Sequence, residues 1–162
     1  MGGSGRTTRI LFVCLGNICR SPLAHVVMAA KVRERGLANR VAVDSCGTGN
    51  WHVGGGADPG SVAVAAGHGL DLSPHRARQL SASDGEDFDW IVCMDASNLR
   101  NVHRMLPGRK RSVIRLRDHD PEGSGNVPDP WARGPEAFEE VYRIVERCCE
   151  ALLDAIQVRE GR

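Results

Sequence analysis

The sequence predicts an α/β fold, in which helices pack on both faces of a parallel sheet in a three-layer α/β/α arrangement. Two observations support this prediction. Short apolar runs rich in β-branched residues alternate along the chain with stretches of helical periodicity, which is the order found in strand–helix–strand units. The 162 residues also suffice for one domain with a substantial core. Right-handed crossovers would then place helices on both faces of the sheet.

Four apolar segments are expected to form the strands. They are ILFV at 10–13, VAV at 41–43, WIVCM at 90–94 and SVIRL at 112–116. Short β-branched runs of this kind are typical of strands. We therefore expect a central four-stranded parallel sheet in a single domain at residues 9–158, preceded by a flexible N-terminal segment, MGGSGRTT, at residues 1–8.

Helices are predicted in the intervals between these strands. Apolar residues share one face over 23–30, small apolar residues fill 62–66, and apolar residues recur at spacings of three and four over 99–106. The clearest helix is the last one, because Pro135 suits a first helical position. Its apolar stripe consists of Phe138, Val141, Tyr142, Val145, Cys149, Leu152 and Ile156. A stripe of this length must pack on the rest of the domain.

Composition excludes several classes of protein. The net charge of +1 gives no long-range attraction to nucleic acid or to a membrane, so neither is expected as a partner. An arginine-rich stretch at 109–117 lacks aromatic residues and is followed by acidic ones, which argues against a nucleic-acid patch. The six cysteines lack paired C-x2-C spacing, so no metal is expected. Six cysteines without an apparent signal peptide favour a reducing, cytoplasmic location.

The loop after the first predicted strand, CLGNICRS at 14–21, has the composition of an oxyanion-binding loop. A strand followed by a turn of small residues and a helix directs free backbone N–H groups at one point. Ligands also bind at the carboxyl ends of parallel strands. Gly16 allows close backbone approach, and Asn17 tolerates left-handed geometry. No GK[ST] sequence follows, which excludes a Walker-type nucleotide loop.

Cys14 would lie at the focus of this loop. The amides, the dipole of the following helix and the guanidinium of Arg20 would each stabilise a thiolate there. Arg20 can also bind two oxygens of a phosphate, and Ser21 can donate a hydrogen bond to the sulfur. A thiolate beneath a phosphate suggests attack on phosphorus, which gives a phosphocysteine that water hydrolyses. Such chemistry needs an acid for the leaving group but no metal, since Arg20 and the amides stabilise the transition-state charge.

The segment VCLGNICRSP resembles the active-site loop of the low-molecular-weight protein tyrosine phosphatases. The similarity extends through GTGNWHVG at 47–54, HRARQL at 75–80, MDASN at 94–98 and VPDPW at 127–131. The family fold is a four-stranded parallel sheet flanked by helices. The resemblance implies that Cys14 is the nucleophile, Arg20 the phosphate clamp, Ser21 the thiolate stabiliser and Asn17 a loop-shaping residue. The other residues of the implied phosphate-binding loop are Leu15, Gly16, Ile18 and Cys19.

The resemblance further implies that Asp129 acts as general acid and then as base. Two other Asp-Pro pairs, at Asp58 and Asp120, compete for that role. Asp129 is preferred because it alone sits beside an aromatic residue, just ahead of the last helix, and Asp120 comes second. Trp51 and Trp131 would hold a phenyl ring between them, although the family usually has tyrosine after Asp-Pro.

Two further residues, His75 and Asp95, would support the loop. Arg78 has no assigned role, and His52 is expected to be structural. The implied partners are phosphotyrosine-containing proteins, with inorganic phosphate as product and no cofactor.

Several alternatives remain open at this stage. Both tryptophans are also compatible with simple packing. Cys19 is either a buried apolar residue or the partner of Cys14 in a reversible disulfide that protects the nucleophile. The other four cysteines are expected to pack in the core. Arsenate reduction, hydrolysis of phosphoarginine and non-catalytic phosphate binding are the competing functions, of which phosphoarginine hydrolysis is disfavoured by Ile18, where the arginine phosphatases carry threonine.

Overall fold

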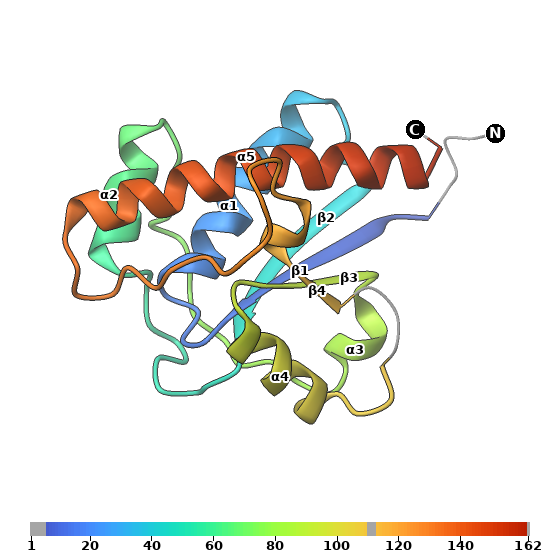
Figure 1. The fold of residues 1–162 in the computed structure, drawn as a ribbon, viewed down its shortest axis with the longest axis horizontal. Helices are drawn as coiled ribbons and strands as arrows, with labels where there is room; N and C mark the ends of the chain where they lie inside the picture. The colour runs from blue at the N-terminus through green and yellow to red at the C-terminus, as the bar shows by residue number, and fades with distance from the viewer. Residues whose placement is uncertain (1–5, 110–112, 162) are drawn as a thin grey trace.

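Four parallel strands form the centre of the molecule in the computed structural model, which describes residues 6–109 and 113–161 (Figure 1). The strands are β1 (Thr8–Cys14), β2 (Val41–Gly47), β3 (Trp90–Cys93) and β4 (Val113–Arg115), in the order β2-β1-β3-β4. All neighbouring strands are parallel. β1 pairs with β2 from Thr8 opposite Val41 to Cys14 opposite Gly47. The predicted four-stranded parallel sheet is thus confirmed.

The strand boundaries differ from the predicted ones in all four strands, in β3 only by its end at Cys93 instead of residue 94. β1 begins at Thr8, which is buried, so the predicted flexible segment 1–8 extends too far; residues 1–5 lie outside the described part of the chain. β2 continues through polar residues to Gly47, because it pairs with β1 along its whole length, as far as Gly47 opposite Cys14. The predicted strand 112–116 loses Leu116 to a 3₁₀ helix (Leu116–His119), and residue 112 lies outside the described residues.

Helices cover both faces of this sheet (Figure 1). One face carries α1 (Arg20–Glu34), α2 (Pro59–Gly67) and the long α5 (Pro135–Arg159), and the other carries α3 (Asp84–Asp87) and α4 (Ala96–Met105). Alternation along β1 supplies both cores, since Ile10 and Phe12 pack toward α1 and α5 while Leu11 and Val13 pack toward α4. The predicted three-layer α/β/α arrangement is confirmed. None of the helices in the described residues has the length and apolar content needed to cross a membrane.

The carboxyl end of β1 is the natural place for a ligand. β1 lies between β2 and β3, so the chain leaves it through α1 toward β2 on one side, while β3 leads through α4 to β4 on the other. Connections that diverge in this way open a crevice beyond the strand ends. The segment of residues 14–20 follows β1 directly and faces that crevice.

A buried carboxylate fixes the long loop between β4 and α5. The side chain of Asp120 has no exposed surface, and it accepts hydrogen bonds from Arg147 Nε at 2.9 Å and from Arg117 Nε at 2.8 Å. The guanidinium of Arg147, together with that of Arg117, holds the pKa of Asp120 well below its usual range. The ion pair between Asp120 and Arg147 thus attaches this loop, which continues to residue 134, to the middle of α5.

We predict that Asp120→Asn lowers the free energy of unfolding at pH 7 by about 3 kcal/mol, since it removes the buried charge that both guanidinium groups contact and, within the described ranges, leaves only Arg147 with another carboxylate, Glu122 at 3.5 Å. A carboxylate with a depressed folded pKa contributes stability above the unfolded pKa, about 3.9, and loses it as the pH falls through the folded value. The stability difference between wild type and variant should therefore narrow between about pH 4 and pH 2.

Chemical denaturation across this pH range measures the difference. Asp154→Asn is the matched control, because Asp154 pairs with Arg35 at 2.9 Å but is 64% exposed, and its loss should cost under about 1 kcal/mol. A difference in the free energy of unfolding between wild type and Asp120→Asn that stays constant with pH would contradict the prediction.

Candidate active site

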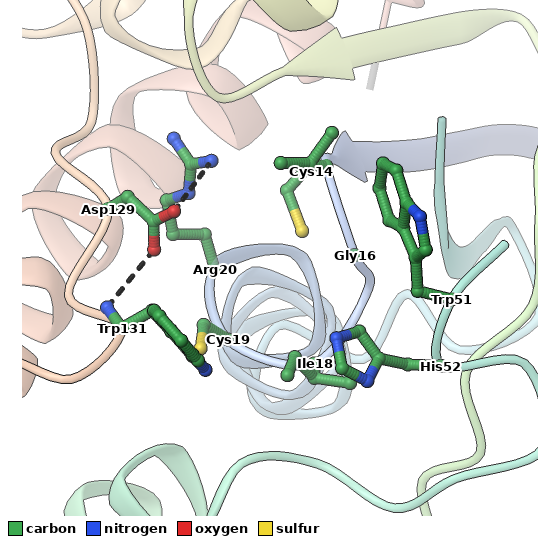
Figure 2. A pocket seen from close by; sticks show the side chains of 10 residues that line it. Cys14, Gly16, Ile18, Cys19, Arg20, Trp51, His52, Asp129 and Trp131 are labelled. Carbon is green, nitrogen blue, oxygen red and sulfur yellow. Dashed lines mark hydrogen bonds and ion pairs between the residues drawn. The ribbon is translucent and has the colours of Figure 1, made fainter. Parts of the chain in front are cut away.

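The sulfur of Cys14 lies at the base of a cavity of about 150 Å³ at the carboxyl end of β1 (Figure 2). The residue is only 3% exposed. Its Sγ accepts a hydrogen bond from the backbone N–H of Asn17 at 3.3 Å and lies 3.0 Å from Ser21 Oγ. Asn17 has a φ of 57°, which bends the backbone back over the sulfur. The predicted left-handed geometry of Asn17 and the placement of Ser21 beside the sulfur are both present.

The side chain of Asn17 holds this loop in place from beneath. It is fully buried, and its Nδ2 donates to Ser21 Oγ at 2.8 Å and to Ser45 Oγ at 3.1 Å. Its Oδ1 accepts from the backbone N–H of Arg78 at 2.9 Å. The Asn17 carbonyl lies 2.8 Å from His75 Nε2, and burial lowers the pKa of His75 and so favours the neutral ring. These contacts place His75 where the sequence predicted loop support.

The end of β2 approaches the loop backbone closely. The N–H groups of Thr48 and Gly49 donate to the carbonyls of Cys14 and Leu15 at 3.0 and 2.9 Å. A Cβ atom on Gly47 would lie 2.7 Å from the Leu15 oxygen, closer than such atoms can be. Glycine is therefore required at position 47 for the loop to pack against the sheet.

Gly16 has a related but looser requirement for space. A Cβ atom on Gly16 would meet the ring of His52 at 3.0 Å. His52 lines the cavity and covers this glycine, which agrees with a structural role for the ring (Figure 2).

Arg20, the first residue of α1, is held by one of its two terminal nitrogens. Its Nη1 donates to Asp95 Oδ2 at 2.7 Å and to the Val127 carbonyl at 3.0 Å. The other oxygen of Asp95 caps α4 by accepting from the Asn98 N–H at 2.8 Å, so Asp95 fixes Arg20 relative to a second strand and helix. Nη2 faces the cavity, and Nε has no acceptor in the described part of the protein. This edge of the guanidinium is free to bind two oxygens of one ligand.

Only one of the three Asp-Pro aspartates lines this cavity. Asp129 stands opposite Cys14, with Oδ2 at 3.9 Å from Arg20 Nη2 and Oδ1 accepting from the Trp131 N–H at 3.1 Å (Figure 2). Its side chain is about half exposed, at 49%. Asp58 instead caps α2 through the Gly60 N–H, and Asp120 is held in its buried ion pairs. Of these three aspartates, Asp129 is therefore the one whose carboxylate can reach a ligand in the cavity.

Two tryptophans stand on opposite sides of the cavity mouth (Figure 2). Trp51 is 68% exposed and Trp131 is 61% exposed, so neither indole packs in the core. Ala132, directly after Trp131, has a φ of 62°, which turns the chain sharply at this point. The indoles and the side chains of Leu15 and Ile18 leave a slot with apolar walls above the sulfur.

The remaining cysteines are all buried thiols. Cys19 lines the same cavity as Cys14 but is 5% exposed, and burial raises the pKa of its thiol. Burial likewise raises the pKa of each of the other four, Cys46, Cys93, Cys148 and Cys149. Buried thiols of this kind pack as small apolar side chains.

Several residues that shape the site were not predicted from the sequence. Ser45 contacts Asn17 across 28 residues of sequence, and the Val127 carbonyl contacts Arg20 across 107. Arg78 forms ion pairs at 3.0 Å with both Asp44 and Asp84. These ion pairs fix the position of the Arg78 backbone N–H, which donates to Asn17 Oδ1. The doublet of arginines in HRARQL was the only available indication of the Arg78 position.

A parallel sheet with a cysteine and an arginine on an anion-binding loop beyond its central strand defines the class of cysteine-based phosphate-loop proteins. A family model described as low molecular weight phosphotyrosine protein phosphatase matches residues 9–161. The low molecular weight protein-tyrosine-phosphatase of Streptomyces coelicolor is 44% identical over 162 residues, which is 96% of this chain and 98% of that protein.

Solved structures agree with this assignment. The crystal structure of YfkJ from Bacillus subtilis superposes with a TM-score of 0.90 at 37% identity, over 96% of this chain and 98% of that one. DARP, a drosophila arginine phosphatase, superposes with a TM-score of 0.83 at 32% identity, over 91% and 97%. The chain belongs to the low molecular weight phosphotyrosine protein phosphatase family and is an enzyme of that family.

We predict that Asn17→Ala weakens the binding of inorganic phosphate more than Asn17→Gly does. Both variants lose the three side-chain hydrogen bonds, but only alanine resists the left-handed backbone, by roughly 1–2 kcal/mol. The expected difference between the two dissociation constants is about tenfold. Titration calorimetry with phosphate, alongside thermal unfolding of each variant, measures it. Equal affinity in wild type and both variants would show that Asn17 does not shape the anion site.

Proposed function

We propose that the protein hydrolyses phosphotyrosine in proteins through a phosphocysteine intermediate on Cys14. The observation that supports this most directly is the arrangement across one cavity: the Cys14 sulfur beneath the loop, the open edge of Arg20 beside it and Asp129 opposite. Each group has the chemistry that its step requires. The membership of a phosphotyrosine phosphatase family supports phosphoproteins as the substrates.

In the first step the phosphoryl group enters the loop and the phenyl ring lies between Trp51 and Trp131. The Cys14 thiolate attacks phosphorus, the bond from phosphorus to the phenolic oxygen breaks, and Asp129 gives its proton to that oxygen. In the second step Asp129 takes a proton from a water molecule, whose oxygen attacks the phosphocysteine. The S–P bond breaks, inorganic phosphate leaves, and the thiolate and the protonated Asp129 are restored.

Transition-state charge is stabilised by groups that are already oriented. The loop N–H groups and the Nε–Nη2 edge of Arg20 surround the position of the three phosphoryl oxygens. Asp95 and the Val127 carbonyl keep Arg20 in this orientation without using that edge. Ser21 Oγ lies 3.0 Å from the sulfur, within reach for its hydroxyl to donate to the thiolate and stabilise it as the leaving group of the second step.

The competing functions have less support. The slot is walled by two indoles and by the methyl groups of Ile18, which offer no hydrogen bond to a guanidinium, so an aryl phosphate fits better than phosphoarginine. Arsenate reduction would need mobile thiols to relay electrons, whereas Cys93, Cys148 and Cys149 are fully buried. Non-catalytic phosphate binding does not explain why the Asp129 carboxylate faces an anion-binding loop, since a carboxylate does not help to bind a phosphate.

Location and redox control are further parts of this proposal. Six unpaired thiols suit a reducing compartment such as the cytoplasm. A reversible Cys14–Cys19 disulfide stays a prediction, supported by the position of both residues on one cavity.

A panel of phosphotyrosine, phosphoserine and phosphoarginine peptides tests the substrate class. We predict turnover of the phosphotyrosine peptide alone, unchanged by EDTA, because the loop N–H groups and Arg20 stabilise the phosphate charge without a metal. A phosphoserine side chain is too short to place its phosphate in the loop while contacting the indoles. Cys14→Ser should abolish turnover. Faster release of phosphate from phosphoarginine would overturn the assignment.

A leaving-group series tests the role of Asp129. Asp129→Ala should slow hydrolysis of aryl phosphates by about 10²–10³-fold for basic phenolate leaving groups and far less for acidic ones, which depart without a proton. The measurement is kcat plotted against the pKa of the free phenol. An equal loss across the series would remove Asp129 from the acid role.

A further inference from the structure

A second hollow lies on the other side of Trp131 from the catalytic cavity. Its volume is about 510 Å³, and it is bounded by α2, by the loop at residues 131–134 and by the first turns of α5. Its apolar lining comes from Ala63, Val64, Trp131, Pro135 and Phe138. We call this hollow the α2–α5 groove. Its volume is sufficient for one or two amino-acid side chains.

The floor of the α2–α5 groove is preformed. Phe138 is only 5% exposed, and its ring lies where a Cβ atom on Gly60 would be, at 2.5 Å. The absence of a side chain at Gly60 therefore allows α2 and α5 to close around the ring. A ligand would meet a fixed apolar surface and would need no rearrangement of the helices.

Trp131 connects this groove to the catalytic cavity, because it lines both. A phenyl ring bound against one face of Trp131 would leave its own main chain at the rim of that indole. The polypeptide that carries the phosphotyrosine must pass this rim, and neighbouring side chains are then within reach of the groove. The groove is thus continuous with the path of a protein substrate and is separate from the path of a small aryl phosphate.

The charged side chains at the edge of the groove differ in the partners that they contact. Asp58 accepts from the Gly60 N–H at 2.8 Å, and Glu139 contacts His68 at 2.9 Å and Arg143 at 3.7 Å. Arg133 also lines the groove, and its guanidinium has no carboxylate within ion-pair distance in the part of the chain that the structure describes. Among the described residues, Arg133 is the one basic residue that lines the groove, so an acidic side chain of a substrate would be attracted to this point and repelled by Asp58 and Glu139.

We propose that the α2–α5 groove is a substrate subsite that binds an aliphatic or aromatic side chain of the phosphoprotein, a few residues from the phosphotyrosine, with an acidic neighbour at Arg133. This inference rests on the proposed function and adds a sequence preference to it. It identifies the preferred substrates as phosphotyrosine segments that carry an apolar residue next to a carboxylate. Small aryl phosphates do not reach the groove.

The test compares wild type with Ala63→Gln and Ala66→Gln. Both alanines are exposed residues of α2, but only Ala63 lines the groove, so Ala66→Gln is the matched control. The substrates are short phosphotyrosine peptides in which leucine replaces alanine at each position within three residues of the phosphotyrosine, and p-nitrophenyl phosphate.

In wild type, leucine at one of these positions should raise kcat/KM about tenfold over alanine. Ala63→Gln should abolish this preference, Ala66→Gln should keep it, and all three proteins should hydrolyse p-nitrophenyl phosphate equally.

A second arm tests the charge. Glutamate beside the preferred leucine should raise kcat/KM over lysine at that place, and Arg133→Gln should reduce that ratio while leaving the leucine preference intact. The subsite is overturned if no position shows a leucine preference, or if the preference survives in Ala63→Gln, while p-nitrophenyl phosphate is still hydrolysed. Loss of p-nitrophenyl phosphate hydrolysis in wild type would instead count against the proposed function itself.

Discussion

The buried side chain of Asn17, in a left-handed backbone conformation, is the constraint on which the active site depends. Its three hydrogen bonds reach α1, β2 and the segment before β3, so three separate parts of the chain together stabilise one loop conformation. The same conformation turns the Asn17 N–H onto the Cys14 sulfur. Backbone dipoles directed in this way cost no reorganisation when a phosphate enters, which is the condition for strong electrostatic stabilisation.

The sheet topology divides the remaining tasks between its two halves. β1 and β2 supply Cys14, the loop and the close contact at Gly47, whereas the turn between β3 and α4 supplies Asp95, which orients Arg20 from the other side of the crevice. The loop before α5 supplies Asp129 and Trp131, and the buried Asp120 ties its beginning to α5. One loop thus separates the cavity above Cys14 from the α2–α5 groove, and Trp131 on that loop lines both of them.

Local patterns in the sequence predicted the sheet, the order of its elements and the anion loop, because strand periodicity, helix spacing and small-residue turns are local properties. Strand ends were less predictable, as at Thr8 and Leu116, where pairing and a 3₁₀ turn decide the boundary. The supporting contacts of Ser45, Arg78 and Val127 depend on tertiary packing, which leaves no local pattern. Asp129 and Asp120 share the same Asp-Pro dipeptide, and the neighbouring Trp131 was the sequence feature that favoured Asp129. The burial and the ion pairs of Asp120 could not be predicted from that pattern.

Alkylation of the native protein by iodoacetate near neutral pH tests most directly whether the fold activates one sulfur beneath an oxyanion site. Burial raises the pKa of the thiols of Cys19, Cys46, Cys93, Cys148 and Cys149, so these five should not react. Peptide mass mapping should find a single label, on Cys14, and inorganic phosphate should suppress it. Label on other cysteines of the folded protein, or labelling of Cys14 that phosphate does not slow, would contradict the proposed site.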